Sequence, residues 1–198
     1  MTPMNDEQLE KIRNDRRQQI ISAALRTFAE NGIRLTKIGM IAAEAGVSHG
    51  LVYHYFESKE EVLHESLAWA MEGADELFRE VRALPLTPLE KVKTFVKFAL
   101  TEGNSDVFRV IQHVTRFGGA PEKTMKMIRQ GSEVYAKELF PLIAAGQADG
   151  SVVEGDPQEL LELLLTVLSG VLMEGDREWW SRNLDRKVDL LLRMLAAR

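Results

Sequence analysis

Apolar residues recur at helical spacing along almost the whole chain, and a glycine or proline stands where most of these runs end. Ile21, Ala24, Leu25 and Phe28 follow the i, i+3, i+4, i+7 pattern of one helix face, and Gly32 closes that run. No segment of useful length alternates polar and apolar residues at period two, as a strand does. The sequence therefore predicts an all-α protein with an N-terminal three-helix head and a C-terminal helical body, about nine helices in all.

Residues that favour helix ends place several boundaries. Thr36 stands where the N-cap of the second helix is expected. Ser58 and Glu61 fit a capping box that starts a fourth, long helix, which we expect to run unbroken over residues 59–83. A strongly apolar helix is expected over residues 157–175, because proline is favoured at a first helical position.

The composition excludes several kinds of site. The 198 residues include no cysteine, which rules out a disulfide framework, a thiolate zinc site, an iron–sulfur cluster and a cysteine nucleophile. We expect no metal and no cofactor. The most apolar stretch, 160–173, is interrupted by polar residues and is shorter than the roughly 20 residues that span a bilayer. With no basic and apolar leader visible, the expected setting is the cytoplasm, without membrane contact.

Charge is divided unevenly along the chain. Residues 1–60 contain 8 of the 25 basic residues and 8 of the 30 acidic residues, so this part is neutral and the net charge of −5 lies beyond it. An acidic protein is a poor general binder of nucleic acid, but a neutral N-terminal part still permits local binding by one end.

The most informative segment is 36–59, which reads as a helix, a glycine turn and a short second helix. Its apolar residues can build a small core with the first helix: Ile38, Ile41, Ala42, Val47, Val52 and Phe56. The core leaves unused a set of polar and aromatic side chains around the short helix: Ser48, His49, Gly50, Leu51, Tyr53, His54 and Tyr55. A helix-turn-helix over about residues 36–56 accounts for them, because its second helix enters the major groove of DNA.

Three spaced motifs extend this segment in both directions. In chain order they are Ile21-x-x-Ala24-Leu25-x-x-Phe28-x-x-x-Gly32, Thr36-x-x-x-x-Ile41-Ala42-x-x-Ala45-Gly46-Val47-Ser48 and Gly50-x-Val52-Tyr53-His54-Tyr55-Phe56-x-Ser58-Lys59-Glu60. Together they resemble the TetR (tetracycline-repressor-like) family of bacterial transcriptional regulators. The resemblance implies a DNA-binding domain over residues 14–74 and a C-terminal ligand-binding and dimerisation domain over residues 75–198.

The resemblance also implies roles by position. Thr36 corresponds to a phosphate contact at the start of the second helix, and Ser48 to the cap of the recognition helix. The expected contacts to bases or phosphates are His49, Gly50, Leu51, Tyr53, His54, Tyr55 and Lys59. Gly39 stands where many relatives carry a longer, often basic residue, which leaves Lys37 as the expected contributor from the second helix.

The last two expected helices carry more apolar residues than one buried face needs. A helix that is apolar nearly all round must be covered on several sides, and a second copy of the chain can supply that cover. A four-helix bundle in a homodimer would use Leu161, Leu164, Leu165, Leu168, Leu172, Val188, Leu191 and Leu195. The competing interpretation is a core within one chain.

Aromatic residues and methionines between the head and the dimer face can line an adaptable apolar pocket for a small molecule. The candidates are Phe95, Phe98, Phe108, Ile111, His113, Phe117, Met127, Tyr135 and Trp179. The family commonly keeps a small-molecule site in this region. Plain core packing is the competing interpretation for each of these side chains.

These patterns predict a dimeric, ligand-responsive transcriptional regulator, interpreted as a repressor that an apolar effector releases from a pseudo-palindromic operator. The expected partners are double-stranded DNA, a second copy of the chain and that effector. The motifs of common hydrolases, metalloproteases, nucleotide-binding enzymes and dehydrogenases are absent, so we do not expect an enzyme. A helical protein-interaction module that has lost DNA binding stays open as the alternative, because residues 1–60 are neutral.

Overall fold

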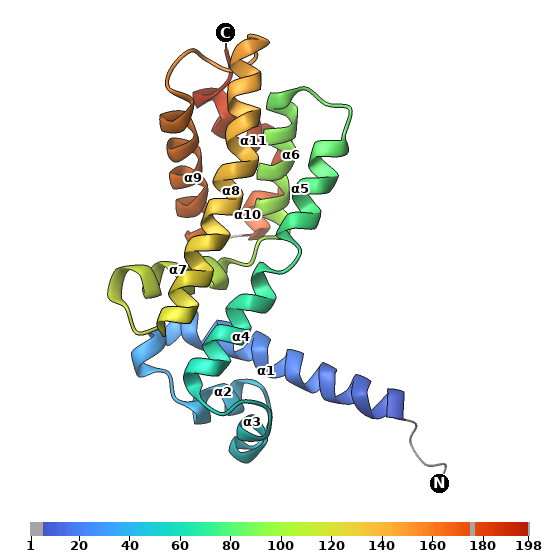
Figure 1. Ribbon diagram of the computed structural model, residues 1–198, viewed down its shortest axis with the longest axis vertical. Coiled ribbons are helices and arrows are strands. Elements are labelled where there is room, and N and C mark those ends of the chain that lie inside the picture. Colours follow the sequence, from blue (N-terminus) through green and yellow to red (C-terminus); the bar gives the residue numbers. More distant parts are fainter. Residues whose placement is uncertain (1–5, 175–176, 198) are drawn as a thin grey trace. The chain divides into compact units, whose positions relative to one another are not determined.

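The computed structural model describes residues 6–174 and 177–197, which form helices joined by short turns (Figure 1). The chain divides into two compact units. The head unit comprises Met1–Ala70 and Arg109–Lys126, and the body unit comprises Met71–Phe108 and Met127–Arg198. Residues 109–126 associate with the head unit although they lie far along the chain.

Four helices of the head unit come from the first 71 residues: α1 (Asp6–Leu35), α2 (Ile38–Glu44), α3 (His49–Tyr55) and α4 (Lys59–Met71). The later part of α7 (Ser105–Phe117) and the first turn of α8 (Glu122–Ala148) complete it. The small core expected from the sequence forms, with Ile21, Phe28, Ile41, Val52 and Phe56 all at most 2% exposed.

The body unit holds α8 from residue 127 onward and five further helices, with a 3-10 turn at Leu192–Met194. These helices are α5 (Ala74–Ala83), α6 (Pro88–Thr101), α9 (Pro157–Glu174), α10 (Arg177–Ser181) and α11 (Leu184–Leu191). Thr87 and Glu90 form a complete capping box at the start of α6. Over the described residues the only strand-like feature is one antiparallel bridge between Val152 and Ala196. The expectation of an all-α fold is confirmed.

The helix expected over residues 59–83 is broken, which corrects the prediction of one continuous lever. Gly73 has φ 87° and separates α4 from α5. A left-handed residue of this kind ends a helix, and glycine adopts it without steric cost. The short α10 is a second addition to the expected set. At the end of α9, Gly175 lies outside the described residues.

A tight turn at Gly32 ends the regular part of α1. Gly32 has φ 72° and ψ 164°, a conformation that is essentially restricted to glycine. His113 of α7 lies against it, since a Cβ atom at this position would be 2.6 Å from the imidazole Cε1. Backbone and neighbour therefore both require glycine here.

No helix in the described ranges is long and apolar enough to cross a membrane. The same ranges contain no group of three or more His, Asp or Glu side chains arranged to hold a metal ion.

Candidate nucleic-acid interface

The short helix α3 presents polar and aromatic side chains on one side and its anchors on the other. The Ser48 hydroxyl accepts a hydrogen bond from the Leu51 N–H at 3.2 Å, so Ser48 is the N-cap expected from the sequence. Val52 and Phe56 are buried. Gly50, His49 and His54 are exposed, Tyr53 is 50% exposed, and Leu51 and Tyr55 are half-buried. We call Ser48–Tyr55, without the buried Val52, the α3 surface.

Aromatic contacts within α3 order this surface. The rings of His49 and Tyr53 meet edge to face with centroids 5.1 Å apart, and His54 and Tyr55 do the same at 5.3 Å. A Cβ atom on Gly39 of α2 would lie 3.8 Å from His49 Cδ2. A longer side chain at position 39 would start beside the imidazole, so glycine there leaves that edge of His49 uncovered.

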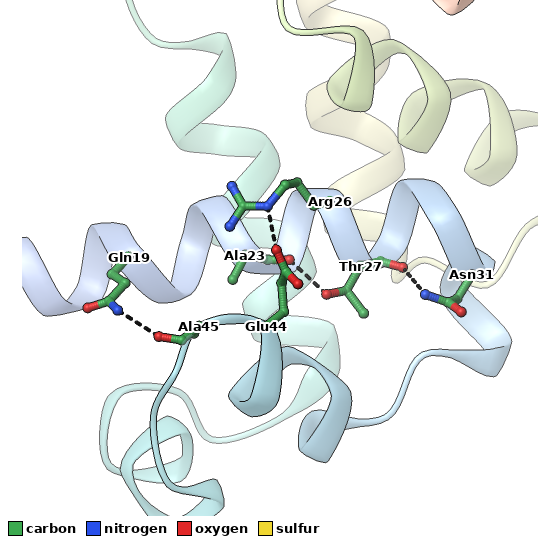
Figure 2. A network of polar contacts seen from close by, with 7 residues as sticks. All are labelled: Gln19, Ala23, Arg26, Thr27, Asn31, Glu44 and Ala45. Carbon is green, nitrogen blue, oxygen red and sulfur yellow. Dashed lines mark hydrogen bonds and ion pairs between the residues drawn. The ribbon is translucent and has the colours of Figure 1, made fainter. Parts of the chain in front are cut away.

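Polar contacts from α1 fix the turn that leads into α3 (Figure 2). The Gln19 amide donates to the Ala45 carbonyl oxygen at 2.6 Å. Arg26 pairs with Glu44 at 2.7 Å, which ties the last residue of α2 to the middle of α1. Because Ala45 and Gly46 form the turn between α2 and α3, these contacts set where the α3 surface lies in the head unit.

A second anchor joins α1 to α4. The Arg17 guanidinium lies 2.5 Å from Glu65 and stacks over the Phe56 ring at 5.4 Å from its centroid. Phe56 is the C-cap of α3, so this contact holds the C-terminal end of that helix. Sequence reasoning missed Arg17, Gln19 and Glu65, because a polar side chain next to an apolar stripe does not reveal its distant partner.

Two expected DNA contacts are used inside the head unit. The Thr36 hydroxyl is buried and donates to the Gly32 carbonyl oxygen at 2.8 Å, while the N-cap of α2 is Lys37. The N-cap prediction for Thr36 is therefore wrong, and its hydroxyl is not free to meet a phosphate. Lys59 donates to the carbonyl oxygens of Ile33 at 2.8 Å and Thr36 at 3.0 Å, which leaves one of its three N–H donors.

The electrostatics of the α3 surface suit a polyanion. The segment 45–56 contains no acidic residue, and Glu44, which precedes it, is paired with Arg26. Lys37 is exposed at the start of α2. The surface thus offers hydrogen-bond donors and aromatic rings with no carboxylate among them.

The expected pocket residues fall into both units. Phe95 and Tyr135 pack with Phe78 in the body unit, where the Phe78 and Phe95 rings stack at 5.3 Å and Tyr135 meets Phe78 edge to face at 5.4 Å. Phe108 and Met127 are half-buried in the same unit, whereas Phe98 and Trp179 are exposed. The other three candidates belong to the head unit: Ile111, His113 and Phe117.

Burial raises the pKa of the Tyr135 phenol above its ordinary value of 10.0. The phenol therefore stays neutral at physiological pH and can act as both hydrogen-bond donor and acceptor among aromatic rings.

The expected dimer residues are corrected by their burial. Six of them are at most 6% exposed within one chain: Leu161, Leu164, Leu168, Leu172, Val188 and Leu195. They form the body core together with α6 and α8, so they have no surface left for a partner. Leu165 and Leu191 are half-buried against that core.

The face of α9 that remains open carries other residues. Leu163 is 47% exposed, and Leu160 and Val167 are half-buried one turn away on the same side. Gly170 continues this side, and a Cβ atom there would meet nothing within 4 Å. We call Leu160, Leu163, Val167 and Gly170 the α9 face.

Sequence comparisons relate the chain to named regulators. It is 35% identical over 80 residues to the transcriptional repressor KstR2 of Mycobacterium tuberculosis, a match that covers 40% of this chain and 40% of that protein. The chain thus spans less than half the length of that relative. With KstR2 of Rhodococcus jostii it is 33% identical over 141 residues, which cover 70% of this chain and 69% of the relative.

Structural comparisons extend the likeness to nearly the whole fold. The structure of the ketosteroid transcriptional regulator KstR2 of M. tuberculosis matches with a TM-score of 0.75 at 20% identity, covering 92% of this chain and 96% of that one. The crystal structure of AibR, in complex with isovaleryl coenzyme A and operator DNA, matches with a TM-score of 0.68 at 20% identity over 79% and 85% of the two chains. At these identities the matches describe the fold.

The family model for bacterial regulatory proteins of the tetR family matches residues 20–66. That range contains α2, α3, the Ser48 cap and the anchors on Ala45 and Glu65. Together with the long match to the R. jostii repressor, it identifies the family: the chain belongs to the TetR family of bacterial transcriptional regulators.

Proposed function

We propose that this protein is a ligand-responsive, DNA-binding transcriptional regulator, a repressor that acts as a homodimer in the cytoplasm. The observation that carries the proposal is the α3 surface. Its polar and aromatic side chains are exposed or, at Tyr55, half-buried, and the helix beneath them is anchored at both ends. Such a rigid, polar helix face is what a major groove accepts.

The contacts divide into two kinds. His49 and Leu51 stand at the leading edge of α3, where an imidazole can hydrogen-bond a base edge and an apolar side chain can meet a thymine methyl group. Tyr53, His54, Tyr55 and Lys37 can reach phosphates, which position the protein without reading sequence. Thr36 and the two bonds of Lys59 support the α2 end from inside the head unit.

The α9 face supports dimer formation. Leu160, Leu163 and Val167 form an apolar strip, and Gly170 permits close approach of a second helix. Members of the TetR family act as dimers, and a symmetric dimer presents two α3 surfaces to two half-sites of a pseudo-palindrome.

The effector is an apolar small molecule that binds the body unit, where Phe78, Phe95 and Tyr135 form an aromatic cluster. It lowers DNA affinity by binding better to a dimer conformation that no longer matches both half-sites. AibR is crystallised with isovaleryl coenzyme A, so a thermal-shift screen begins with coenzyme A thioesters.

The experiment enriches a duplex from a random-sequence library with the full-length protein and measures its Kd by fluorescence anisotropy. Tyr53→Ala should weaken binding at least tenfold, because it removes a half-exposed ring from the α3 surface. Gln112→Ala, an exposed polar change on α7 in the same unit, should leave the Kd unchanged. Failure to enrich any duplex would reject DNA binding and favour the alternative, a helical protein-interaction module.

A further inference from the structure

The first turns of α1 lie outside the region that the family model describes. That model begins at residue 20, whereas α1 begins at Asp6. Every side chain from Glu7 to Asp15 is exposed. Figure 1 shows this part of α1 running out beyond α2 and α3 with no other helix of the head unit beside it. Nothing in the core therefore accounts for its composition.

The rotation of this projecting segment is fixed by its root. Gln19 is bonded to Ala45 and Arg17 to Glu65, so α1 is held between the α2–α3 turn on one side and α4 on the other. An α-helix advances 100° per residue, so the direction of each side chain in the preceding turns follows from these two anchors.

One stripe of the segment continues the part of the buried side of α1 that lies between the two anchors. Farther along the helix that stripe is formed by Ile20, Ala23, Ala24 and Thr27, all at most 4% exposed within the head unit. Counting back by helical periodicity, the same stripe carries Leu9, Ile12, Arg13 and Arg16. Around the helix axis, this stripe lies between the direction of Gln19 and the direction of Arg17. It is therefore on the side of α1 that faces the helix-turn-helix.

Charge on the segment is separated between the two sides. Arg13 and Arg16 lie on the stripe, whereas Glu7, Glu10, Asp15 and Lys11 lie off it by helical periodicity. Arg16 donates to the neutral Gln19 amide at 2.7 Å, and Arg13 has no carboxylate partner among the described residues. Two guanidinium groups that form no ion pair with a described residue thus lie on the side of α1 that faces the helix-turn-helix.

We propose that this overhang, defined as Leu9, Ile12, Arg13 and Arg16, is a second contact surface for the same DNA duplex that the α3 surface binds. The proposal rests on the proposed function. Arg16 is one helical turn from Gln19, which holds the turn into α3, and Arg13 is one turn farther out, at about 1.5 Å per residue along the axis. A duplex seated against α3 therefore extends past the overhang, where the guanidinium groups bind phosphates and the two apolar side chains lie along the sugars.

The test uses the salt dependence of binding, because each phosphate contact contributes about 0.9 to the slope of log Kd against log salt concentration. The full-length protein and the variant Arg13→Gln/Arg16→Gln are titrated with the library-enriched duplex by fluorescence anisotropy. Because the proposed dimer carries two copies of each arginine, the variant loses four phosphate contacts and its slope should be smaller by about 3.6. Its thermal unfolding should be nearly unchanged, because Arg13 is exposed and the one hydrogen bond of Arg16, to Gln19, is exposed to solvent.

Lys11→Gln and Arg16→Gln make a matched pair, since each removes one positive charge from the same segment. Arg16→Gln should lower the slope by about 1.8, one contact in each copy of the dimer, and Lys11→Gln should leave it within experimental error. The proposal is overturned if the double variant keeps the wild-type slope, which would assign the overhang to a protein partner. It is equally overturned if both single variants lower the slope alike, because the effect would then be general charge.

The two proposals fail in different ways. If the wild-type protein enriches no duplex, the proposed function is wrong, and the proposal that the overhang contacts DNA is rejected as well. If Tyr53→Ala weakens binding while Arg13→Gln/Arg16→Gln leaves the slope unchanged, DNA binding by α3 stands and only the overhang is rejected.

Discussion

The head unit and the body unit differ in the polarity of their buried side chains. Among the described residues, the buried polar side chains are Thr27, Thr36, Ser66 and Thr124, and all four belong to the head unit. The core of the body unit is built from aliphatic and aromatic side chains. The head core therefore combines packing with directed hydrogen bonds, whereas the body core depends on packing alone.

This difference suits different tasks. Thr27, Thr36 and Ser66 each donate to a backbone carbonyl, and such bonds specify one geometry because a misplaced partner leaves a buried group unsatisfied. Apolar packing tolerates rearrangement as long as volume and pattern are kept. A rigid unit fits a groove of fixed shape, and an adaptable one fits a small molecule.

The largest effect should come from the body core. Leu164→Ala removes a fully buried side chain and should lower the free energy of unfolding by about 2–5 kcal/mol, because it leaves a cavity. Leu163→Glu, at the neighbouring position on the α9 face, should leave the fold intact and yield a monomer. Urea denaturation and light scattering measure the two outcomes. A stable Leu164→Ala variant that is monomeric would restore the original interface assignment.

A smaller effect should come from a hydrogen bond in the head. Thr36→Val keeps the shape of the side chain but removes a buried hydroxyl, so the free energy of unfolding should fall by about 1 kcal/mol. Thr94→Val in α6 is the matched change, since its hydroxyl also donates to a backbone carbonyl, at 2.9 Å, but is exposed. It should cost less than about 0.5 kcal/mol. An equal loss of unfolding free energy in the two variants would mean that buried hydrogen bonds contribute no more in the head unit than exposed ones do in the body unit.

The smallest effect concerns pH. Burial raises the pKa of Tyr135 above 10.0, so the unfolded chain loses this proton at lower pH than the folded chain. The stability linked to the neutral phenol is complete below pH 10 and falls as pH rises towards the folded-state pKa. Tyr135→Phe should flatten the decline of unfolding free energy above pH 10, measured by urea denaturation at a series of pH values. An identical decline in Tyr135→Phe and wild type would contradict the assignment.

Much of the head could be predicted from sequence because its signals are local. Ser48 caps α3 by accepting from the N–H three residues ahead, and Gly46 supplies the left-handed residue after α2 with φ 63°. The role of Thr36 could not, since its hydroxyl turns back to Gly32 instead of forward to α2. The hydroxyl of a threonine between two helices can bond to the end of the preceding helix or cap the following one. The path of the chain through the Gly32 turn decides which of the two bonds forms.

The body was harder because periodicity identifies a face without identifying what covers it. Periodicity predicts that Leu161, Leu164 and Leu168 form a buried stripe, but it does not distinguish a partner chain from the core of the same chain, where they lie. The break at Gly73 was missed because a glycine within a helical pattern costs only about 1 kcal/mol, which neighbouring residues can outweigh. The pocket candidates could not be divided between the units, because residues 109–126 join the head only in three dimensions.

The Gly32 turn has a consequence for how this sequence can change over time. Replacing His113 by a smaller residue makes room for a Cβ atom at position 32. The backbone there still has φ 72° and ψ 164°, a conformation that residues other than glycine adopt only at a steric cost. Relaxing the backbone alone still brings a new side chain into the imidazole. No single substitution elsewhere therefore makes a residue other than glycine acceptable at position 32. In related sequences that keep this turn, we expect residue 113 to vary while glycine is retained at position 32.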